Sequence, residues 1–461
     1  MIYLKEFKKN KYMKKLLLLS SLLISGALFS QSWTEQNTNY PTTTPGTYTG
    51  DISVVSATTA WAMAQRTSTT NHQRYSKTTD GGTTWTTGTI NVGSTTLVGV
   101  ANITAVDGNT AWVSGFQATA TPTALQGVYK TISGGSIWAR QSGAAFSSGS
   151  FVNFVHFWDA NNGVCMGDKL GGYYEIYTTT NGGSTWTRTP SANIQASTGN
   201  YGYTGKFTVK GNTIWFGTDA GELMRSTDKG LNWTTIATPI ADFGGGTITT
   251  VAGEVAFKDD NTGVLIKNNL DATGATTSSE LYRTVNGGTT WTLVPATGFY
   301  NGAIAYAGTS ILVTGASSGT TAAGFGSAYS LNDGTTWTNI DGVGKTSLSF
   351  LSETVGFAGG FSTAGVGGAY KFTNNLGTAK FDENSFTAYP NPVNDVVTIT
   401  NKDNATFNAI SITDINGRTV KTVKADNVSE LQVNVSELNS GIYFLNISSE
   451  NGKAVKKFIK N

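Results

Sequence analysis

The sequence predicts an all-β protein, and three of its features support this. Gly occurs 56 times and Trp eleven times in 461 residues, and Gly, Thr and aromatic residues are typical of short strands joined by turns. A turn-like motif that ends in Trp recurs between residues 78 and 337. After residue 380, apolar and polar residues alternate and Asn-Gly pairs separate the runs, as in antiparallel hairpins. Many short strands are therefore expected along the chain.

The recurring motif has the form Ser/Thr-x-Asp/Asn-x-Gly-x-Thr-Trp, and its Trp residues lie 46 to 58 residues apart. Its six copies are TTDGGTTW (78–85), TISGGSIW (131–138), TTNGGSTW (179–186), STDKGLNW (226–233), TVNGGTTW (284–291) and SLNDGTTW (330–337). The Asp or Asn side chain can accept hydrogen bonds from nearby backbone N–H groups, and the Gly can adopt angles closed to other residues. The second copy departs from the pattern at Ser133 and Ile137.

A second periodic feature indicates seven units rather than six. Short apolar strands are centred on Trp61, Trp112, Val164, Trp215, Val264, Leu312 and Phe357. In the seventh unit, Thr373-x-Asn375-x-Gly377 carries the start of the motif without its Trp. The N-terminal stretch SWTEQ, which contains Trp33, carries the end of the motif without its start.

These two fragments complete each other if the units form a closed ring. A ring of four-stranded sheets that stays open leaves two unprotected sheet edges. A strand around Trp33 that joins the last sheet would remove both edges. Residues 31–380 are therefore expected to form a seven-bladed β-propeller.

The motif resembles the Asp-box, also called the bacterial neuraminidase repeat, over about residues 31–380. The resemblance implies that each motif joins the third and fourth strands of a blade. Sialidases, xyloglucanases, sorting receptors and photosystem II stability/assembly factors share this repeat, and a seven-unit ring with GGTTW turns is most similar to the last type. Because every residue of the motif has a role in folding, the resemblance predicts the fold and leaves the function open.

Residues 1–30 are expected to be a signal peptide. From Met13 they combine a basic start, a short apolar run and small residues before Gln31. The run is too short to span a bilayer, so a transmembrane protein is not expected. Removal of the six Lys and one Glu of this segment leaves 25 basic and 28 acidic residues. No basic patch is left in the propeller to suggest nucleic-acid binding.

Residues 381–461 are expected to form a small antiparallel β-sandwich, and they resemble the type A sorting domain of the type IX secretion system. The matching positions are Tyr389, Pro390, Asn391, Pro392, Asp414, Gly417, Arg418, Leu438, Gly441, Tyr443, Lys456 and Lys457. The resemblance implies that the type IX secretion machinery exports the protein, which is then released or attached to the outer-membrane surface of a Gram-negative bacterium. The alternative is an immunoglobulin-like sandwich in a periplasmic protein.

No catalytic constellation is evident in the propeller. Its arginines lack the pattern by which sialidases hold a substrate carboxylate; they are Arg66, Arg74, Arg140, Arg188, Arg225 and Arg283. A glycosidase needs two carboxylates about 5–9.5 Å apart. The acids expected nearest the face opposite the motif turns are Asp51, Asp168, Asp219, Glu222 and Asp242. His72 and His156 lack metal-ligand spacing, and Cys165 is expected to be buried, so no metal site is expected. We also expect no cofactor and a monomeric protein.

Binding is the favoured function, because the loops between blades are rich in aromatic residues. These are Tyr40, Tyr48, Phe146, Tyr201, Tyr203, Phe243, Phe299 and Tyr300. Exposed rings among Thr, Asn and Gly suit stacking on sugars or neutral peptide, although such rings can also fold back over the blades. We take Tyr201, Tyr203, Phe299 and Tyr300 as the candidate site of an adhesion module for a glycan or protein. The alternative is a secreted glycan-acting hydrolase.

Overall fold

The computed structural model describes residues 31–41, 46–67, 72–119, 124–144, 146, 149–244, 250–317, 324–363, 366–373, 386–401, 407–428, 430–449 and 452–461. The expected signal peptide lies outside the described residues. The described residues form two compact units, 31–373 and 386–461.

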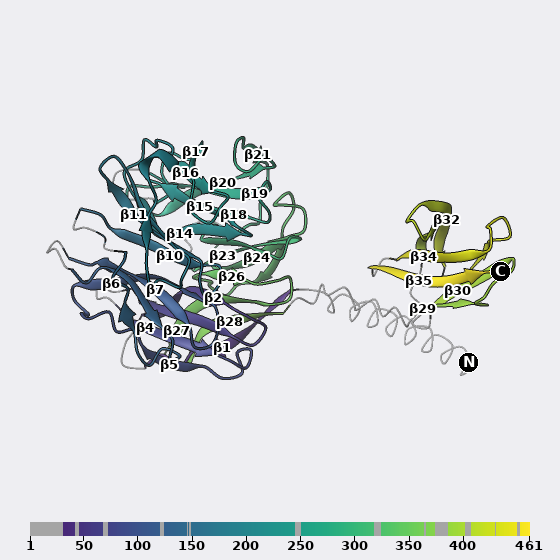
Figure 1. The fold of residues 1–461 in the computed structure, drawn as a ribbon, viewed down its shortest axis with the longest axis horizontal. Helices are drawn as coiled ribbons and strands as arrows, with labels where there is room; N and C mark the ends of the chain where they lie inside the picture. The colour runs from purple at the N-terminus through teal and green to yellow at the C-terminus, as the bar shows by residue number, and fades with distance from the viewer. Residues whose placement is uncertain are drawn as a thin grey trace, which may run out of the picture. The chain divides into compact units, whose positions relative to one another are not determined.

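The strands of residues 31–373 form the seven four-stranded antiparallel blades of a β-propeller (Figure 1); blades 2 to 6 are separate sheets, and blades 1 and 7 are joined into one eight-stranded sheet by the pairing of Tyr48 with Phe361. Blades 1 to 3 consist of β2 (Thr47–Val54), β3 (Ala60–Arg66), β4 (Arg74–Thr78) and β5 (Thr86–Thr89); β6 (Val98–Ala105), β7 (Ala111–Gln117), β8 (Gly127–Thr131) and β9 (Ala139–Arg140); and β10 (Val152–Phe157), β11 (Gly163–Leu170), β12 (Tyr173–Thr179) and β13 (Thr187–Arg188). A 3-10 helix, Ser191–Asn193, follows blade 3.

Blades 4 to 6 repeat this order. They consist of β14 (Gly202–Lys210), β15 (Thr213–Thr218), β16 (Glu222–Ser226) and β17 (Thr234–Ala237); β18 (Val251–Phe257), β19 (Gly263–Leu270), β20 (Thr276–Thr284) and β21 (Thr292–Val294); and β22 (Ala303–Ala307), β23 (Ile311–Ala316), β24 (Gly326–Ser330) and β25 (Thr338–Asp341). In Figure 1 the first strands β10, β14 and β18 lie toward the middle of the propeller, and the fourth strands β5 and β17 lie at its periphery.

Blade 7 is completed by the N-terminal strand. It contains β26 (Leu348–Phe350), β27 (Gly356–Thr363) and β28 (Val366–Thr373), and β1 (Ser32–Asn37) pairs antiparallel with β28. The register runs from Ser32 opposite Thr373 to Asn37 opposite Gly368. This pairing confirms the ring closure expected from the sequence. The rest of the expected seventh motif, Asn375 and Gly377, lies outside the described residues.

Strand alternation divides the propeller into two faces. Within a blade the chain reverses direction at each turn, so the third-to-fourth turns all lie at the same end of the sheets. We call this the box face; it carries the six motif turns between residues 78 and 337. The opposite end, which we call the loop face, carries the connections between blades, such as residues 189–201, and the second-to-third turns, such as residues 219–221.

Large aromatic side chains fill the spaces between blades. Trp112 stacks on Phe157 of the next blade with ring centroids 3.6 Å apart, and Trp215 stacks on Phe257 at 4.0 Å. Both Trp side chains are fully buried. The motif residue Trp138 packs back on Trp61 of blade 1. Since loss of a buried aromatic side chain usually costs about 3–5 kcal/mol, these contacts hold neighbouring blades together.

Residues 386–461 form two antiparallel sheets that share one core, as the sequence predicts. One sheet contains β29 (Phe386–Tyr389), β30 (Val396–Asn401) and β33 (Glu430–Asn434); the other contains β31 (Phe407–Asp414), β32 (Thr419–Val428), β34 (Gly441–Ser449) and β35 (Gly452–Lys460). Val397, Ile399 and Val433 of the first sheet and Leu445 and Phe458 of the second belong to this core.

Candidate functional site

The motif turns use their polar side chains internally. In all six turns, which lie within the described residues, the first hydroxyl accepts the N–H of the Gly four residues on, at 2.8–3.0 Å. The third residue accepts the N–H four residues after it, at 2.9–3.0 Å. In the divergent second turn the Ser133 hydroxyl replaces the carboxylate and accepts from Ile137. The first and third side chains of these turns therefore stabilise the turns themselves.

Cations on the box face join neighbouring blades, a role that the sequence interpretation missed. The Lys77 ammonium donates to the carbonyl oxygens of Gly108 (2.7 Å) and Gly134 (3.1 Å) while it lies over the Trp61 ring. Lys130 repeats this arrangement one blade further on. The sequence contains a signal for this role of the cations, because Lys or Arg directly precedes the motif in four blades.

The first strands of the blades enclose a central channel with a volume of about 990 Å³. Its charged groups are largely paired: Lys206 contacts Glu254, and the Lys210 ammonium of blade 4 donates to the Gly308 carbonyl of blade 6 at 3.2 Å. Burial raises the pKa of Asp51 to about 6, although the N–H groups of Ile103 and Ile52 partly offset this. The channel is thus a cavity with charged lining groups, of which Lys206 and Glu254 are paired with each other.

Tyr201 and Tyr203 come together on the loop face at the start of β14. Their rings are T-shaped with centroids 5.6 Å apart, and both are half-buried. The Tyr203 hydroxyl donates to Asp242, which is buried. Tyr201 is therefore partly exposed, whereas the Tyr203 hydroxyl is already engaged.

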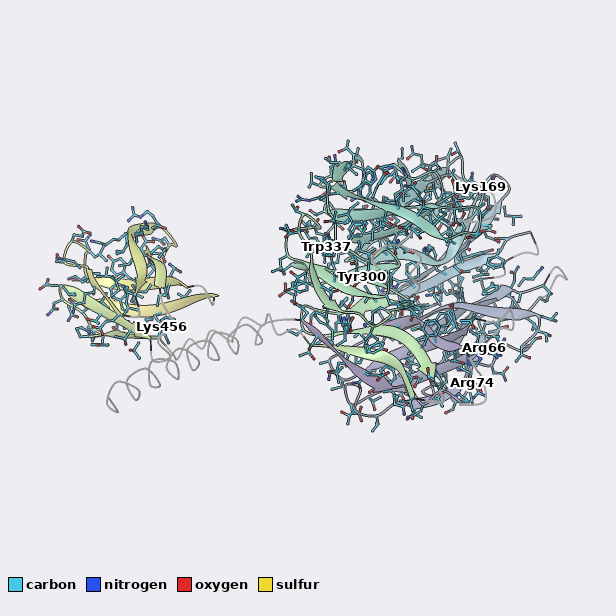
Figure 2. All side chains as sticks on the ribbon, turned by 180° about the vertical axis from the view of Figure 1, so that it is seen from behind. Arg66, Arg74, Lys169, Tyr300, Trp337 and Lys456 are labelled. Carbon is cyan, nitrogen blue, oxygen red and sulfur yellow. The ribbon has the colours of Figure 1, made fainter. Side chains whose placement is uncertain are left out.

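Phe299 and Tyr300 belong to a separate part of the loop face. Phe299 is 9% exposed and packs on Trp337 with ring centroids 5.8 Å apart, so it offers little surface. Tyr300 is half-buried, and its hydroxyl donates to Asn339 at 3.0 Å. In Figure 2 Tyr300 lies near Trp337, and Lys169 of blade 3 lies in another part of the propeller.

Three of the other loop aromatics cover the blades. Tyr40, Phe146 and Phe243 are at most 6% exposed. Phe243 packs with Trp215 and Phe257 at the junction of blades 4 and 5. These three rings fold back onto the blades, because burial of their apolar surface is more favourable than exposure in a Gly-rich loop.

Carboxylates gather beside Tyr201. Asp219 accepts the N–H groups of Asn200 (2.6 Å) and Tyr201 (3.2 Å). Glu222 accepts the hydroxyls of Ser197 (2.5 Å) and Thr198 (2.9 Å). Burial acts to raise the pKa of Glu222, but these hydrogen bonds outweigh it and the net pKa is lowered.

Asp168 is the third carboxylate of this group and has a different environment. Burial raises its pKa to about 6, opposed by hydrogen bonds from the Asn153 amide and the Gly202 N–H and reinforced by the charge of Asp219. The Asn153 amide donates to Asp168 at 2.7 Å. The structure thus brings together three of the five acids that the sequence nominated. We name Asp168, Asp219 and Glu222 the carboxylate cluster.

Tyr174 lies under the carboxylate cluster, and sequence reasoning missed it. Its side chain is fully buried, and its hydroxyl lies beside the Ser197 hydroxyl, which acts to lower its pKa. Burial raises its pKa, and the charges of Asp219, Glu222 and Asp168 add to this effect, so all three carboxylates lie within electrostatic reach of the hydroxyl. No sequence signal could have found it, because the pairing of β11 with β12 creates this neighbourhood.

The two histidines lie apart. Burial lowers the pKa of His72 to about 4, with further contributions from Arg66 and Arg74, which Figure 2 shows close together. Burial also lowers the pKa of His156 to about 4. Cys165 is fully buried, which raises the pKa of its thiol. Within the described residues no group of three or more His, Cys, Asp or Glu could hold a metal ion.

In the C-terminal unit, the expected sorting residues hold the two sheets together. Asn391 accepts the N–H of Ile459 at 2.9 Å, and its amide donates to the Lys457 carbonyl. Gly417 has φ = 78° in the turn closed by Asp414. Tyr443 stacks on Phe458 and donates to Asn439. Of the remaining motif residues, Tyr389 is 50% exposed, Pro390 and Pro392 follow β29, and Gly441 begins β34.

Residues 387–461 match the family model of the secretion system C-terminal sorting domain. No curated protein sequence matches the chain. Among solved structures, YCF48 bound to D1 peptide is 14% identical, with 74% of this chain and 96% of that chain covered and a TM-score of 0.49. YCF48 from Cyanidioschyzon merolae is 15% identical over 74% and 98% of the two chains, with a TM-score of 0.45. The GH74 enzyme of Niastella koreensis is 14% identical over 92% and 74%, with a TM-score of 0.46.

The sorting-domain match identifies the class of protein. The chain carries a seven-bladed β-propeller followed by a domain that directs export to the cell surface or extracellular space. This confirms the predicted destination and implies recognition by the secretion machinery. In the part of the chain that the structure describes, no helix is long and apolar enough to cross a membrane. The solved structures, at these low identities, say nothing about a ligand.

Proposed function

We propose that the exported propeller is a binding module whose ligand site lies on its loop face, centred on Tyr201. The observation that carries this proposal is the half-buried pair Tyr201 and Tyr203 beside the carboxylate cluster. A rigid aromatic surface next to ionised acceptors offers both stacking and hydrogen bonding, which are the usual elements of recognition sites.

Four further observations support the proposal. The box face uses its motif side chains in its own turns. In the central channel Lys206 contacts Glu254, and the Lys210 ammonium donates to the Gly308 carbonyl. Phe299 is withdrawn against Trp337, so the site is better placed on blade 4 than on blade 6. Tyr300 keeps a half-buried ring and is proposed as a secondary contact.

The test is a glycan and protein array probed with the full-length chain and with Tyr201→Ala. We expect the variant to lose its ligand signal by about tenfold, since stacking on an aromatic ring contributes about 1–3 kcal/mol. Tyr282→Ala, which removes a half-buried tyrosine from strand β20, is the matched control. Signals that stay equal in Tyr201→Ala and the full-length chain would refute the proposed site.

One observation favours hydrolysis of a glycan as the second candidate function. Asp168, with its pKa raised to about 6 by burial, lies within electrostatic reach of Asp219, which is held by two backbone N–H groups. Two carboxylates with different environments are the usual acid and base pair of glycosidases. Release of reducing ends from an array-identified glycan, abolished by Asp168→Asn, would establish this function. Bound glycan that stays intact would exclude it.

A further inference from the structure

The second motif turn lacks a hydrogen bond that the other five turns make. In those turns the third and seventh side chains hydrogen-bond to each other at 2.6–2.9 Å, as Asp80 and Thr84 do. The second turn has Ser133 and Ile137 at these positions, and the isoleucine side chain can neither donate nor accept. Because Ile137 is also 71% exposed, this departure weakens the turn without a gain in packing, so folding does not explain it.

Ile137 instead lines an apolar groove that blades 2 and 3 share. Ile132, which is 72% exposed, lines the same groove, whose volume is about 710 Å³. The motif turn of blade 3 contributes Gly183 and Ser184 to the lining. Exposed apolar side chains that gather in one hollow are typical of a surface that a partner covers. We call this hollow the isoleucine groove.

The charged residues of the isoleucine groove are positive. Lys130 and Arg140 belong to its lining, and the described lining residues include no carboxylate. The Lys130 ammonium donates to the Gly182 carbonyl at 2.9 Å, and Arg140 donates to the Gln126 carbonyl through Nε and Nη2. These neutral partners orient the two cations without cancelling their charge, and neither cation forms an ion pair with a described residue. The groove therefore attracts anionic groups.

The isoleucine groove also follows an edge strand. β9 is the fourth strand of blade 2, and among the described strands it pairs with β8 alone. Both residues of β9, Ala139 and Arg140, line the groove. An unpaired strand edge presents backbone N–H and C=O groups to which an extended segment can add. Because side chains alternate along an extended segment, every second one would then face the groove.

We propose that the isoleucine groove binds an extended acidic peptide segment of a partner protein. One apolar side chain of the segment lies between Ile132 and Ile137, and a carboxylate two residues away pairs with Lys130 or Arg140. The second motif turn thus exchanges a stabilising bond for a binding surface, as is common at functional sites. This inference goes beyond the proposed function, because the groove adjoins motif turns of the box face, whereas Tyr201 lies on the loop face.

The test uses short synthetic peptides and the full-length chain at low salt. The acidic probes contain Glu-Thr-Leu-Thr-Glu, or the same sequence with Ile or Phe at its centre. One set of matched probes has Gln in place of both Glu residues, and another has Ser in place of the central residue. Fluorescence polarisation of the labelled peptides measures binding. We expect an acidic probe to bind and both replacements to weaken its binding at least about tenfold, because they remove charge-assisted hydrogen bonds and buried apolar surface, respectively.

A variant that restores the common turn locates the binding. Ser133→Asp with Ile137→Thr removes an apolar side chain from the groove and adds a carboxylate, so it should weaken binding at least about tenfold. The same variant regains the bond between the third and seventh side chains, so a loss of binding would not come from unfolding. Val285→Thr is the matched control, because it removes an apolar side chain that is 62% exposed in a motif turn outside the groove.

A second variant tests the charge of the groove. Arg140→Gln keeps a donor for the Gln126 carbonyl and removes the charge, so it should weaken binding about threefold, as expected for a partly exposed ion pair. Arg188→Gln is its matched control, since Arg188 stands at the same distance after the motif Trp in blade 3 and does not line the groove.

Several results would overturn the inference. Among the binding results they are no binding of any acidic probe, equal binding of an acidic probe and its Gln counterpart, or equal effects of the restored turn and of Val285→Thr. Sedimentation of the full-length chain supplies another, because self-association that the restored turn abolishes would assign the groove to a second copy of the protein. The proposed function fails separately, when no array ligand depends on Tyr201.

Discussion

At the residue scale, identical side chains acquire different roles from burial and partners. Tyr40 is 1% exposed and covers a blade, whereas Tyr201 is only half-buried. The Asp219 carboxylate accepts hydrogen bonds from backbone N–H groups, whereas burial is the largest influence on the pKa of Asp168. The candidate site depends on these differences, because its two carboxylates lie in different environments beside one aromatic ring.

Asp168 should make folding stability depend on pH. Its folded pKa of about 6 lies above the ordinary value of 3.8, so its neutral form favours the folded state. This stabilisation is complete below pH 3.8 and is lost as pH rises through 6. Asp168→Asn stays neutral and keeps the acceptor for Asn153. Its melting temperature relative to the unmodified protein should therefore rise between pH 4 and pH 7 by about 2–4 °C.

The measurement is calorimetry of both proteins at several pH values. The difference cancels the contributions of other carboxylates such as Asp80, whose pKa is lowered to about 2 by hydrogen bonds to Thr84. A difference in melting temperature that stays constant from pH 4 to pH 7 would show that Asp168 does not titrate in this range.

At the element scale, the third-to-fourth turn is the repeated unit of the propeller. The first hydroxyl and the third side chain satisfy N–H groups that the turn would otherwise expose. Asp80 makes one more bond, because its second oxygen accepts the Thr84 hydroxyl at 2.6 Å. The second turn lacks this bond, since Ile137 occupies the position of Thr84 and is 71% exposed.

Restoring the common residues in the second turn should stabilise the protein. Ser133→Asp with Ile137→Thr recreates the hydroxyl-to-carboxylate bond and should add about 0.5–1.5 kcal/mol to the free energy of unfolding. Ser133→Asp alone should add less. Denaturant titration measures the effect, and the reverse exchange, Asp80→Ser with Thr84→Ile, should lower the free energy. Equal stability of all these variants would mean that the extra bond contributes nothing.

At the scale of the whole molecule, the N-terminal strand fastens the ring. Trp33 packs on Phe372 with ring centroids 4.9 Å apart, and its indole N–H donates to Ser327 of blade 6 at 3.0 Å. The buried Lys345 ammonium pairs with Asp341 at 2.9 Å and lies over the Trp33 ring. One residue of β1 thus contacts two blades.

Loss of Trp33 should open the ring. Trp33→Ala removes both contacts, and because the ring is half-buried the free energy of unfolding should fall by about 2–3 kcal/mol. Denaturant titration with light scattering would also detect aggregation through the freed edge of β28. Ser32→Ala, on the same strand, is the control. An unchanged denaturation midpoint in Trp33→Ala would contradict closure by β1.

The repeats made the propeller predictable, whereas the candidate site was only partly so. The ring closure could be predicted, because the segments around Trp33 and Thr373 each contain half of a motif, and these segments pair in the structure. Burial of Phe299 and Phe243 was not predictable, since it depends on which blade a loop meets. The carboxylates were nominated singly, and only strand pairing and loop contacts bring Asp168, Asp219 and Tyr174 together.

Hydrogen–deuterium exchange tests the central claim, that the loop face of blades 3 and 4 binds the ligand. The full-length chain would be compared with and without the ligand identified on the array. We predict slower exchange in residues 168–174, 197–203 and 219–222, and no change in the motif turns of the box face. Protection centred on the box face, or none at residues 197–203, would contradict the account.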